Sequence, residues 1–154
     1  MLIFLDIDGV MVPAKGWKTP ELLSDGFPAF SDKASRVLQR LISENTTIVL
    51  TTSHKANYTI DEWKDIFTKR SIHVENLKRL DNNVNNLSRK DEILNWFAVN
   101  NINDNFVIID DDKSLNDFPD SLKKNLILTN PIIGLTDEHL ESIMIIINKD
   151  LEFA

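Results

Sequence analysis

The sequence predicts an α/β domain built around a mostly parallel β-sheet. Short apolar runs alternate with segments whose apolar residues recur at helical spacing, which is typical of that class. The length of 154 residues suits one domain, and a hydrophobic content of 42% is enough for a core without disulfides or a structural metal. Cysteine is absent, which excludes zinc–thiolate sites and cysteine nucleophiles. We therefore expect residues 1–154 to form a single domain.

The chain is acidic, with 24 acidic and 17 basic side chains and a net charge of −7. This balance argues against strong non-specific binding to nucleic acid or to a membrane surface, because both need clustered Lys and Arg. The apolar start Met1–Leu5 is too short for a signal peptide, and no apolar run approaches the ~20 residues of a membrane span. We expect a soluble protein of the cytoplasm with no membrane partner.

The first half of the chain predicts strands and helices in alternation. Leu2–Leu5 is apolar and too short for a helix, which favours a buried strand. Residues 11–30 are rich in Pro and Gly and predict a loop. Ser31 is expected to cap a helix, residues 46–51 (TTIVLT) to form a β-branched strand, and Thr59 to cap the next helix.

The second half continues this alternation. The expected elements are a short strand within residues 72–80, a loop at 82–86, a helix capped by Ser88, strands at 106–109 and 126–128, and a last helix capped by Thr136. The helix after Ser88 is expected to bury its apolar residues, which are Ile93, Leu94, Trp96, Phe97 and Val99.

Two carboxylates directly follow the first strand, in the sequence Asp6-Ile7-Asp8-Gly9. Ligands of parallel α/β sheets bind at the carboxyl ends of the strands. Carboxylates there are costly unless a cation neutralises them, and Mg²⁺ prefers one or two carboxylates with phosphate oxygens and water. A polar strand end followed by a plain Asp-Gly turn is the alternative interpretation.

Hydroxyls and a cation form a second group of candidates. Thr51 and Thr52 end the second strand, where hydroxyls and free N–H groups can hold a phosphoryl oxygen. Taken alone, this feature is better explained by strand propensity followed by a cap. Lys90 stands in the first turn of a predicted helix, where it opposes the helix dipole. It therefore either faces carboxylates and a phosphate or is solvated. Arg89 is the neighbouring candidate.

Three consecutive aspartates, Asp110, Asp111 and Asp112, follow the strand at 106–109. Adjacent carboxylates repel one another unless a cation lies between them. A metal site is the simplest interpretation, and an acidic loop that faces water is the alternative.

Taken together, these motifs resemble those of the haloacid dehalogenase (HAD) superfamily. Its four motifs occur in order between residues 6 and 112. The chain is similar to the small HAD phosphatase-like domains, including those of Swiss Army Knife RNA-repair proteins, in the stretches LDIDGV, IVLTTSHK, VIIDDD and TNPIIGLTDEHL. The resemblance implies a three-layer α/β/α Rossmann-like fold. The segments between the motifs are too short for a large cap domain.

The resemblance also implies a role for each motif residue. Asp6 would be the nucleophile that becomes an aspartyl-phosphate, and Asp8 the general acid and then the general base. Mg²⁺ would be held by Asp6, by Asp8 through its backbone carbonyl, and by Asp111 or Asp110. The phosphoryl group would be bound by Thr51 and Thr52 and its charge neutralised by Lys90. Two departures from the family pattern are an Asp in place of the usual Gly in the last motif, and a lysine whose helical register is only inferred.

The implied activity is that of a Mg²⁺-dependent phosphatase with an open site. Its phosphorylated substrate is left open among nucleotides, nucleic-acid ends, phosphoproteins and small phosphate esters. Two other classes remain: a catalytically silent HAD-like binding or regulatory domain, and a receiver-like phospho-acceptor domain. Five residues beside the motifs are candidates for the rim of the site or for plain loop surface, namely Lys15, Trp17, Lys18, His54 and Lys55.

Overall fold

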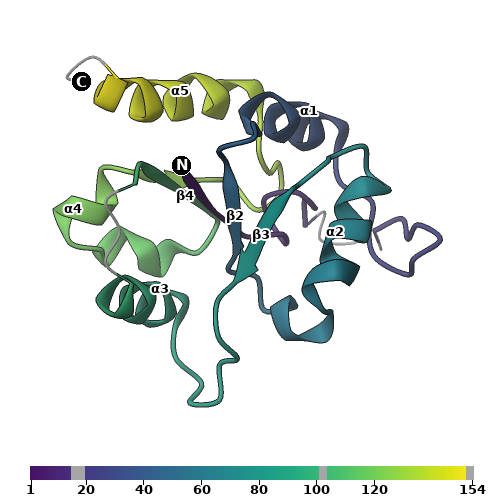
Figure 1. The fold of residues 1–154 in the computed structure, drawn as a ribbon, viewed down its shortest axis with the longest axis horizontal. Helices are drawn as coiled ribbons and strands as arrows, with labels where there is room; N and C mark the ends of the chain where they lie inside the picture. Colours follow the sequence, from purple (N-terminus) through teal and green to yellow (C-terminus); the bar gives the residue numbers. More distant parts are fainter. Residues whose placement is uncertain (15–19, 101–103, 152–154) are drawn as a thin grey trace.

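Five parallel strands form the centre of the molecule, in the order β3-β2-β1-β4-β5 (Figure 1). The computed structural model describes residues 1–14, 20–100 and 104–151. The strands are β1 (Leu2–Leu5), β2 (Thr47–Leu50), β3 (Asn76–Arg79), β4 (Phe106–Asp110) and β5 (Leu126–Leu128). The chain builds outward from β1 through β2 to β3, then returns to the other side of β1 with β4. The strand order therefore reverses between β1 and β4, which is where open α/β sheets bind ligands.

Helices cover both faces of this sheet, so the α/β/α fold that the sequence predicts is confirmed (Figure 1). The helices are α1 (Asp32–Leu41), α2 (Ile60–Thr68), α3 (Arg89–Val99), α4 (Asp120–Lys123) and α5 (Asp137–Leu151), with 3₁₀ turns η1 (Lys55–Asn57) and η2 (Lys113–Asp117). No helix in the described ranges has the length and apolar character needed to cross a bilayer.

Alternate residues of the central strand point to opposite faces of the sheet, as the period of two requires. Ile3 and Leu5 of β1 join the apolar cluster under α1, α2 and α5, whereas Phe4 joins the cluster under α3 and α4. All three side chains are completely buried. A parallel strand covered on both faces is apolar throughout, which is why Leu2–Leu5 carries no polar residue.

The predicted N-caps of three helices are confirmed by hydrogen bonds. The Ser31 hydroxyl accepts from the Ala34 N–H, Thr59 forms a capping box with Glu62, and the Ser88 hydroxyl accepts from the Asp91 N–H.

Thr136, the expected cap of the last helix, directly precedes α5, and its carbonyl accepts from the Leu140 N–H at 3.3 Å. Its other hydrogen bonds run to a helix side chain. The N–H of Thr136 donates to Nδ1 of His139 at 2.9 Å, and the Thr136 hydroxyl lies 3.1 Å from the same nitrogen. A helix side chain thus binds the residue that the sequence assigns as the cap.

One residue of the predicted apolar face of α3 is exposed. Val99, expected to be buried, is 83% exposed, whereas Ile93 is completely buried. Val99 is six positions beyond Ile93, which places the two about 120° apart around an α-helix. Trp96 and Phe97 lie nearer the Ile93 side and pack on Phe4 with ring centroids 4.9 and 5.1 Å from it.

Candidate active site

Three carboxylates meet at the edge of the sheet where the strand order reverses. Asp6 directly follows β1, Asp110 ends β4 and Asp111 follows it. One carboxylate oxygen from each lies within 4.8 Å of the others. Asp6 and Asp110 are buried. Burial raises the pKa of Asp6 to about 9, and the charge of Asp110 adds to this effect. Burial also raises the pKa of Asp111.

This cluster has the chemistry of a divalent cation site. Its donors are carboxylate oxygens that repel one another, and burial together with the charge of Asp110 raises the pKa values of Asp6 and Asp111. Hard oxygen donors in this number fit Mg²⁺, which keeps its remaining positions for water and phosphate oxygens.

Arg89 is the cation that the structure brings to the carboxylates. Its Nη1 donates to Asp110 Oδ2 at 2.8 Å and lies 3.3 Å from Asp6 Oδ1. The same nitrogen lies 3.5 Å from the Thr51 hydroxyl. The two carboxylates hold the pKa of Arg89 above its usual range, so the guanidinium stays charged.

Lys90, to which the sequence assigned this position, forms no ion pair with a carboxylate of the described residues. The physical reason is helical register. Arg89 is the first residue of α3, directly after the Ser88 cap, and the next residue is turned by about 100° around the helix axis. Neighbouring helical residues cannot face the same group.

The protein itself occupies both oxygens of Asp110. Oδ1 accepts from the N–H groups of Asp111 and Asp112 at 2.8 and 3.1 Å, and Oδ2 accepts from Arg89. Asp111 lies against the turn after β1, because a Cβ on Gly9 would come within 2.1 Å of its Oδ2. Gly9 also has a φ of +81°. Both facts make glycine the residue that fits there.

Thr51 and Thr52 are both completely buried at the end of β2. The Thr51 hydroxyl lies 3.4 Å from Asp110 Oδ2, so Thr51 belongs to the cluster. The Thr52 hydroxyl instead accepts from the N–H of His54 at 3.2 Å. Thr52 therefore shapes the turn that leads away from the strand.

Asp8 stands apart from the three clustered carboxylates. Its side chain is 57% exposed, and its Oδ2 lies 2.8 Å from Nε2 of His54. His54 thus contacts a motif residue, a contact that the sequence left undecided between site rim and plain surface. The contact joins the turn after β1 to the turn after β2.

Two further features were not predicted. Lys55 and Glu92 form a buried ion pair of 2.8 Å, and Glu92 Oε1 lies 3.9 Å from Nε of Arg89. On the other side, the hydroxyl of Thr129 donates to the carbonyl of Gly9 at 2.7 Å. In the sequence, Lys55 and Thr129 stand out only because they follow predicted strands, and Glu92 only because it lies in a predicted helix. Lys15, Trp17 and Lys18 lie outside the described residues.

The family model described as the HAD domain in Swiss Army Knife RNA repair proteins matches residues 2–140. The chain belongs to this family. The match includes all four motifs and the segment after β5 that carries Thr129. No curated protein and no solved structure matched in the corresponding searches.

Membership of the HAD family indicates hydrolase chemistry of the phosphatase type, a class that typically uses Mg²⁺. The carboxylate cluster of this HAD domain, formed by Asp6, Asp110 and Asp111, is where such an ion fits. The repair context in the family description indicates a phosphorylated substrate.

Proposed function

We propose that this HAD domain is a Mg²⁺-dependent phosphohydrolase that forms an aspartyl-phosphate on Asp6. The observation that carries the proposal is the shared position of Arg89, which lies 3.3 Å from Asp6 and 2.8 Å from Asp110. A buried carboxylate beside a fixed guanidinium, at the strand edge where phosphates bind, suits phosphoryl transfer, which depends on positioning and charge neutralisation.

Asp6 and Asp111 are the residues that we assign to the metal, because the protein engages both oxygens of Asp110. When bound, Mg²⁺ would supply positive charge to the carboxylates and to the phosphate oxygens. Asp110 then has a positioning role, since it holds Arg89 and Thr51 together.

The first half of the reaction uses Asp6 and Asp8. The free carboxylate oxygen of Asp6 attacks phosphorus, because Oδ1 already accepts the N–H of Ile7 at 2.9 Å. The bond from phosphorus to the leaving oxygen breaks, and Asp8 gives that oxygen a proton. Arg89 and the Thr51 hydroxyl bind the phosphoryl oxygens in the transition state.

The second half returns Asp6 to its free form. Asp8, now a carboxylate, takes a proton from a water that attacks phosphorus from the side opposite Asp6. The bond from phosphorus to Asp6 breaks, and inorganic phosphate leaves. The exposure of Asp8 suits this role, because both the leaving group and the water reach it from solvent.

We further propose that the substrate is a nucleotide or the phosphorylated end of a nucleic acid. The support is the family description, which names RNA repair proteins. The net charge of −7 opposes non-specific binding to long nucleic acid. It is compatible with recognition of one terminal phosphate by the local cation Arg89.

The test is hydrolysis of a generic aryl phosphate with and without Mg²⁺. We expect Mg²⁺-dependent turnover in the unmodified chain and in Asp65→Asn, a control at an exposed aspartate of α2. The hydrolysis rate of Asp6→Asn should fall to the uncatalysed background. Its circular dichroism spectrum, recorded without Mg²⁺, should match that of the unmodified chain. If the unmodified chain neither turns over the ester nor binds Mg²⁺ by calorimetry, the domain is a silent binding module. A stable phosphoprotein without turnover would indicate a phospho-acceptor domain.

A further inference from the structure

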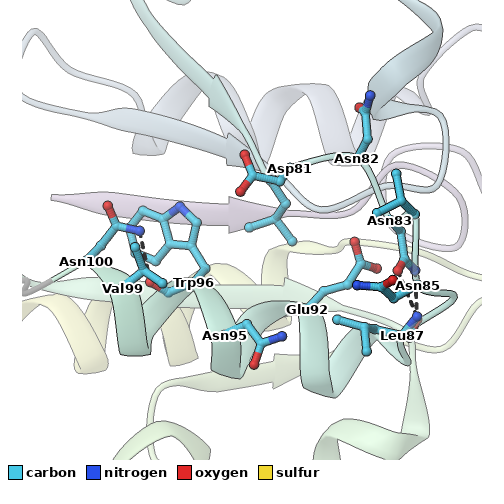
Figure 2. Close-up of a pocket in the computed structure, with 12 residues that line it drawn as sticks. Asp81, Asn82, Asn83, Asn85, Leu87, Glu92, Asn95, Trp96, Val99 and Asn100 are labelled. Atoms are coloured by element: carbon cyan, nitrogen blue, oxygen red, sulfur yellow. Dashed lines mark hydrogen bonds between the residues drawn. The ribbon is translucent and has the colours of Figure 1, made fainter.

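A pocket of about 320 Å³ lies beside the carboxylate site, between α3 and the segment that joins β3 to α3. Figure 2 shows α3 along one side of this pocket, with Glu92 and Trp96 rising from it toward Asp81. The volume lies within the range of small-molecule sites, which begins at about 300 Å³. Nothing in the proposed reaction uses this pocket.

Glu92 joins the pocket to the site. Glu92 is one of the lining residues, and its Oε1 lies 3.9 Å from Nε of Arg89. Arg89 itself lies outside the lining, and the pocket extends along α3 from Glu92 past Asn95 and Trp96. At a rise of 1.5 Å per residue, Trp96 is about 10 Å along the helix from Arg89. A group attached to a phosphate at Arg89 can therefore reach into the pocket.

The lining of the pocket suits an uncharged, flat, hydrogen-bonding group. Five of the 12 lining residues are asparagines, two are the acidic residues Asp81 and Glu92, and none is Lys, Arg or His. A second phosphate would therefore find no cation there. Asparagine amides offer a donor and an acceptor side by side, which matches the edge of a nucleobase. The carboxylate of Asp81, which is not engaged by Lys55 as Glu92 is, can accept from an exocyclic amino group of a base. Trp96 adds an aromatic wall.

The loop wall of the pocket is held in place by its own side chains. The Asn83 amide donates to the carbonyl of Leu87 at 2.8 Å and accepts from the Leu87 N–H at 2.7 Å (Figure 2). Asn86 adopts a positive φ of 51°, which Asn tolerates better than most residues. In contrast, the side chains of Asn82 and Asn95 make no hydrogen bond to another described residue. These two amides are free to bind a ligand.

We propose that this pocket binds the nucleobase attached to the phosphate that reacts at Asp6, and that it prefers bases with an exocyclic amino group. This inference rests on the proposed function, because it places the reacting phosphate beside Arg89. Adenine is the most suitable probe, since it offers an amino donor beside a ring acceptor. Uracil lacks the amino group and would offer no donor to the carboxylate of Asp81.

The first experiment compares adenosine monophosphates, both 5′ and 3′, with uridine monophosphates and with the corresponding ribose phosphates that lack a base. We expect kcat/KM at least tenfold higher for the better adenosine ester than for its baseless counterpart, with the uridine ester in between. The variant Asn82→Ala/Asn95→Ala should lose most of this advantage and keep the rate on the aryl phosphate. Asn45→Ala, an exposed asparagine at the other edge of the sheet, should behave as the unmodified chain.

The second experiment does not depend on turnover. Adenosine monophosphate is titrated into ¹⁵N-labelled Asp6→Asn protein, and the side-chain signals of Trp96, Asn82 and Asn95 are followed. Shifts confined to these signals, absent with ribose phosphate and in the double variant, would support the pocket. Equal kcat/KM with and without a base, or unshifted signals, would overturn it even where the aryl phosphate is hydrolysed. Loss of aryl phosphate turnover with the shifts intact would overturn only the proposed reaction.

A third comparison separates the two sources of the base. Adenosine monophosphate is compared with a short oligoribonucleotide that carries the same adenylate at its phosphorylated end. A higher kcat/KM for the oligonucleotide assigns the pocket to a nucleic-acid end, whereas equal values assign it to a free nucleotide.

Discussion

The ammonium of Lys55 lies 2.8 Å from the carboxylate of Glu92, and the two side chains are only 4% and 9% exposed. Lys55 belongs to the turn after β2 and Glu92 to the first turn of α3. The pair therefore fastens the helix that carries Arg89 to the strand edge that carries Thr51. A buried charge without its partner is costly, so each residue depends on the other.

Removal of either member of this pair should destabilise the fold. We expect Lys55→Met or Glu92→Leu to lower the free energy of unfolding by about 3–5 kcal/mol, because each leaves one buried charge unpaired. The double variant should lose less than the sum of the two. Urea unfolding measures this, with Lys33→Met on the exposed face of α1 as the control. A Lys55→Met protein as stable as that control would contradict the interpretation.

Arg89 and Lys90 provide a direct comparison between adjacent cations. Arg89→Met should reduce kcat on the aryl phosphate by about 10²–10³, as expected for the loss of one fixed group that stabilises developing charge. Lys90→Met should leave kcat within a few-fold of the unmodified value, because it removes no contact with Asp6 or Asp110. Steady-state measurements of kcat for Arg89→Met and Lys90→Met show which of the two cations takes part in the reaction. The opposite ranking would restore the original assignment of Lys90.

Asp111 and Asp112 test the proposed metal ligands in the same way. Asp111→Asn should weaken Mg²⁺ binding at least ~10-fold in calorimetry, because the change removes a charged oxygen donor from the cluster. Asp112→Asn is the matched control. The Asp112 carboxylate accepts from the N–H of Ser114 at 2.9 Å, and an asparagine oxygen can replace it. Equal Mg²⁺ affinity in the two variants would exclude Asp111 as a ligand.

The ion pair between Asp25 and Arg70 predicts a change of stability in acid. Arg70 donates to both oxygens of Asp25, at 2.7 and 3.1 Å. These hydrogen bonds lower the pKa of Asp25 to about 2 from its ordinary value of 3.8. Because the folded-state pKa is the lower one, the unfolded chain binds more protons between these values. The stabilisation is therefore complete above about pH 4 and is lost as the pH falls toward 2.

The measurement compares the unfolding free energies of the unmodified chain and Asp25→Asn at neutral pH, pH 4 and pH 2.5. At neutral pH the unfolding free energy of the unmodified chain should be clearly higher than that of Asp25→Asn. This difference should become smaller as the pH falls toward 2.5. Glu21→Gln, at an exposed residue of the same loop, should show no such pH-dependent difference. If the difference in unfolding free energy became larger in acid, the stabilising role of the Asp25–Arg70 ion pair would be refuted.

The local sequence was sufficient for the strands and for most caps. Leu2–Leu5 and Leu126–Leu128 occur where their apolar runs predict them, since a buried parallel strand is set by its own composition. Ser31, Thr59 and Ser88 cap their helices because each cap bonds only to residues three positions away.

The choice between Arg89 and Lys90 was beyond the sequence. It depends on where the first helical residue points, and a shift of one position turns a side chain by about 100°. Lys55 and Glu92 were also inaccessible, because each alone resembles an ordinary solvated charge. Only the fold shows that residues 37 positions apart in the chain are buried together. Thr129 and Gly9 meet across 120 positions for the same reason.

The central place of β1 has a consequence for how the chain acquires its structure. Leu2 pairs with Thr47 on one side and with Phe106 on the other. During synthesis β1 is therefore made before both of its partner strands, β2 and β4. Pairings this distant along a chain make folding slow. Until β4 is available, one edge of the apolar strand Leu2–Leu5 stays open to other chains. A nascent chain therefore depends on protection of the segment Leu2–Leu5 until β4 has emerged.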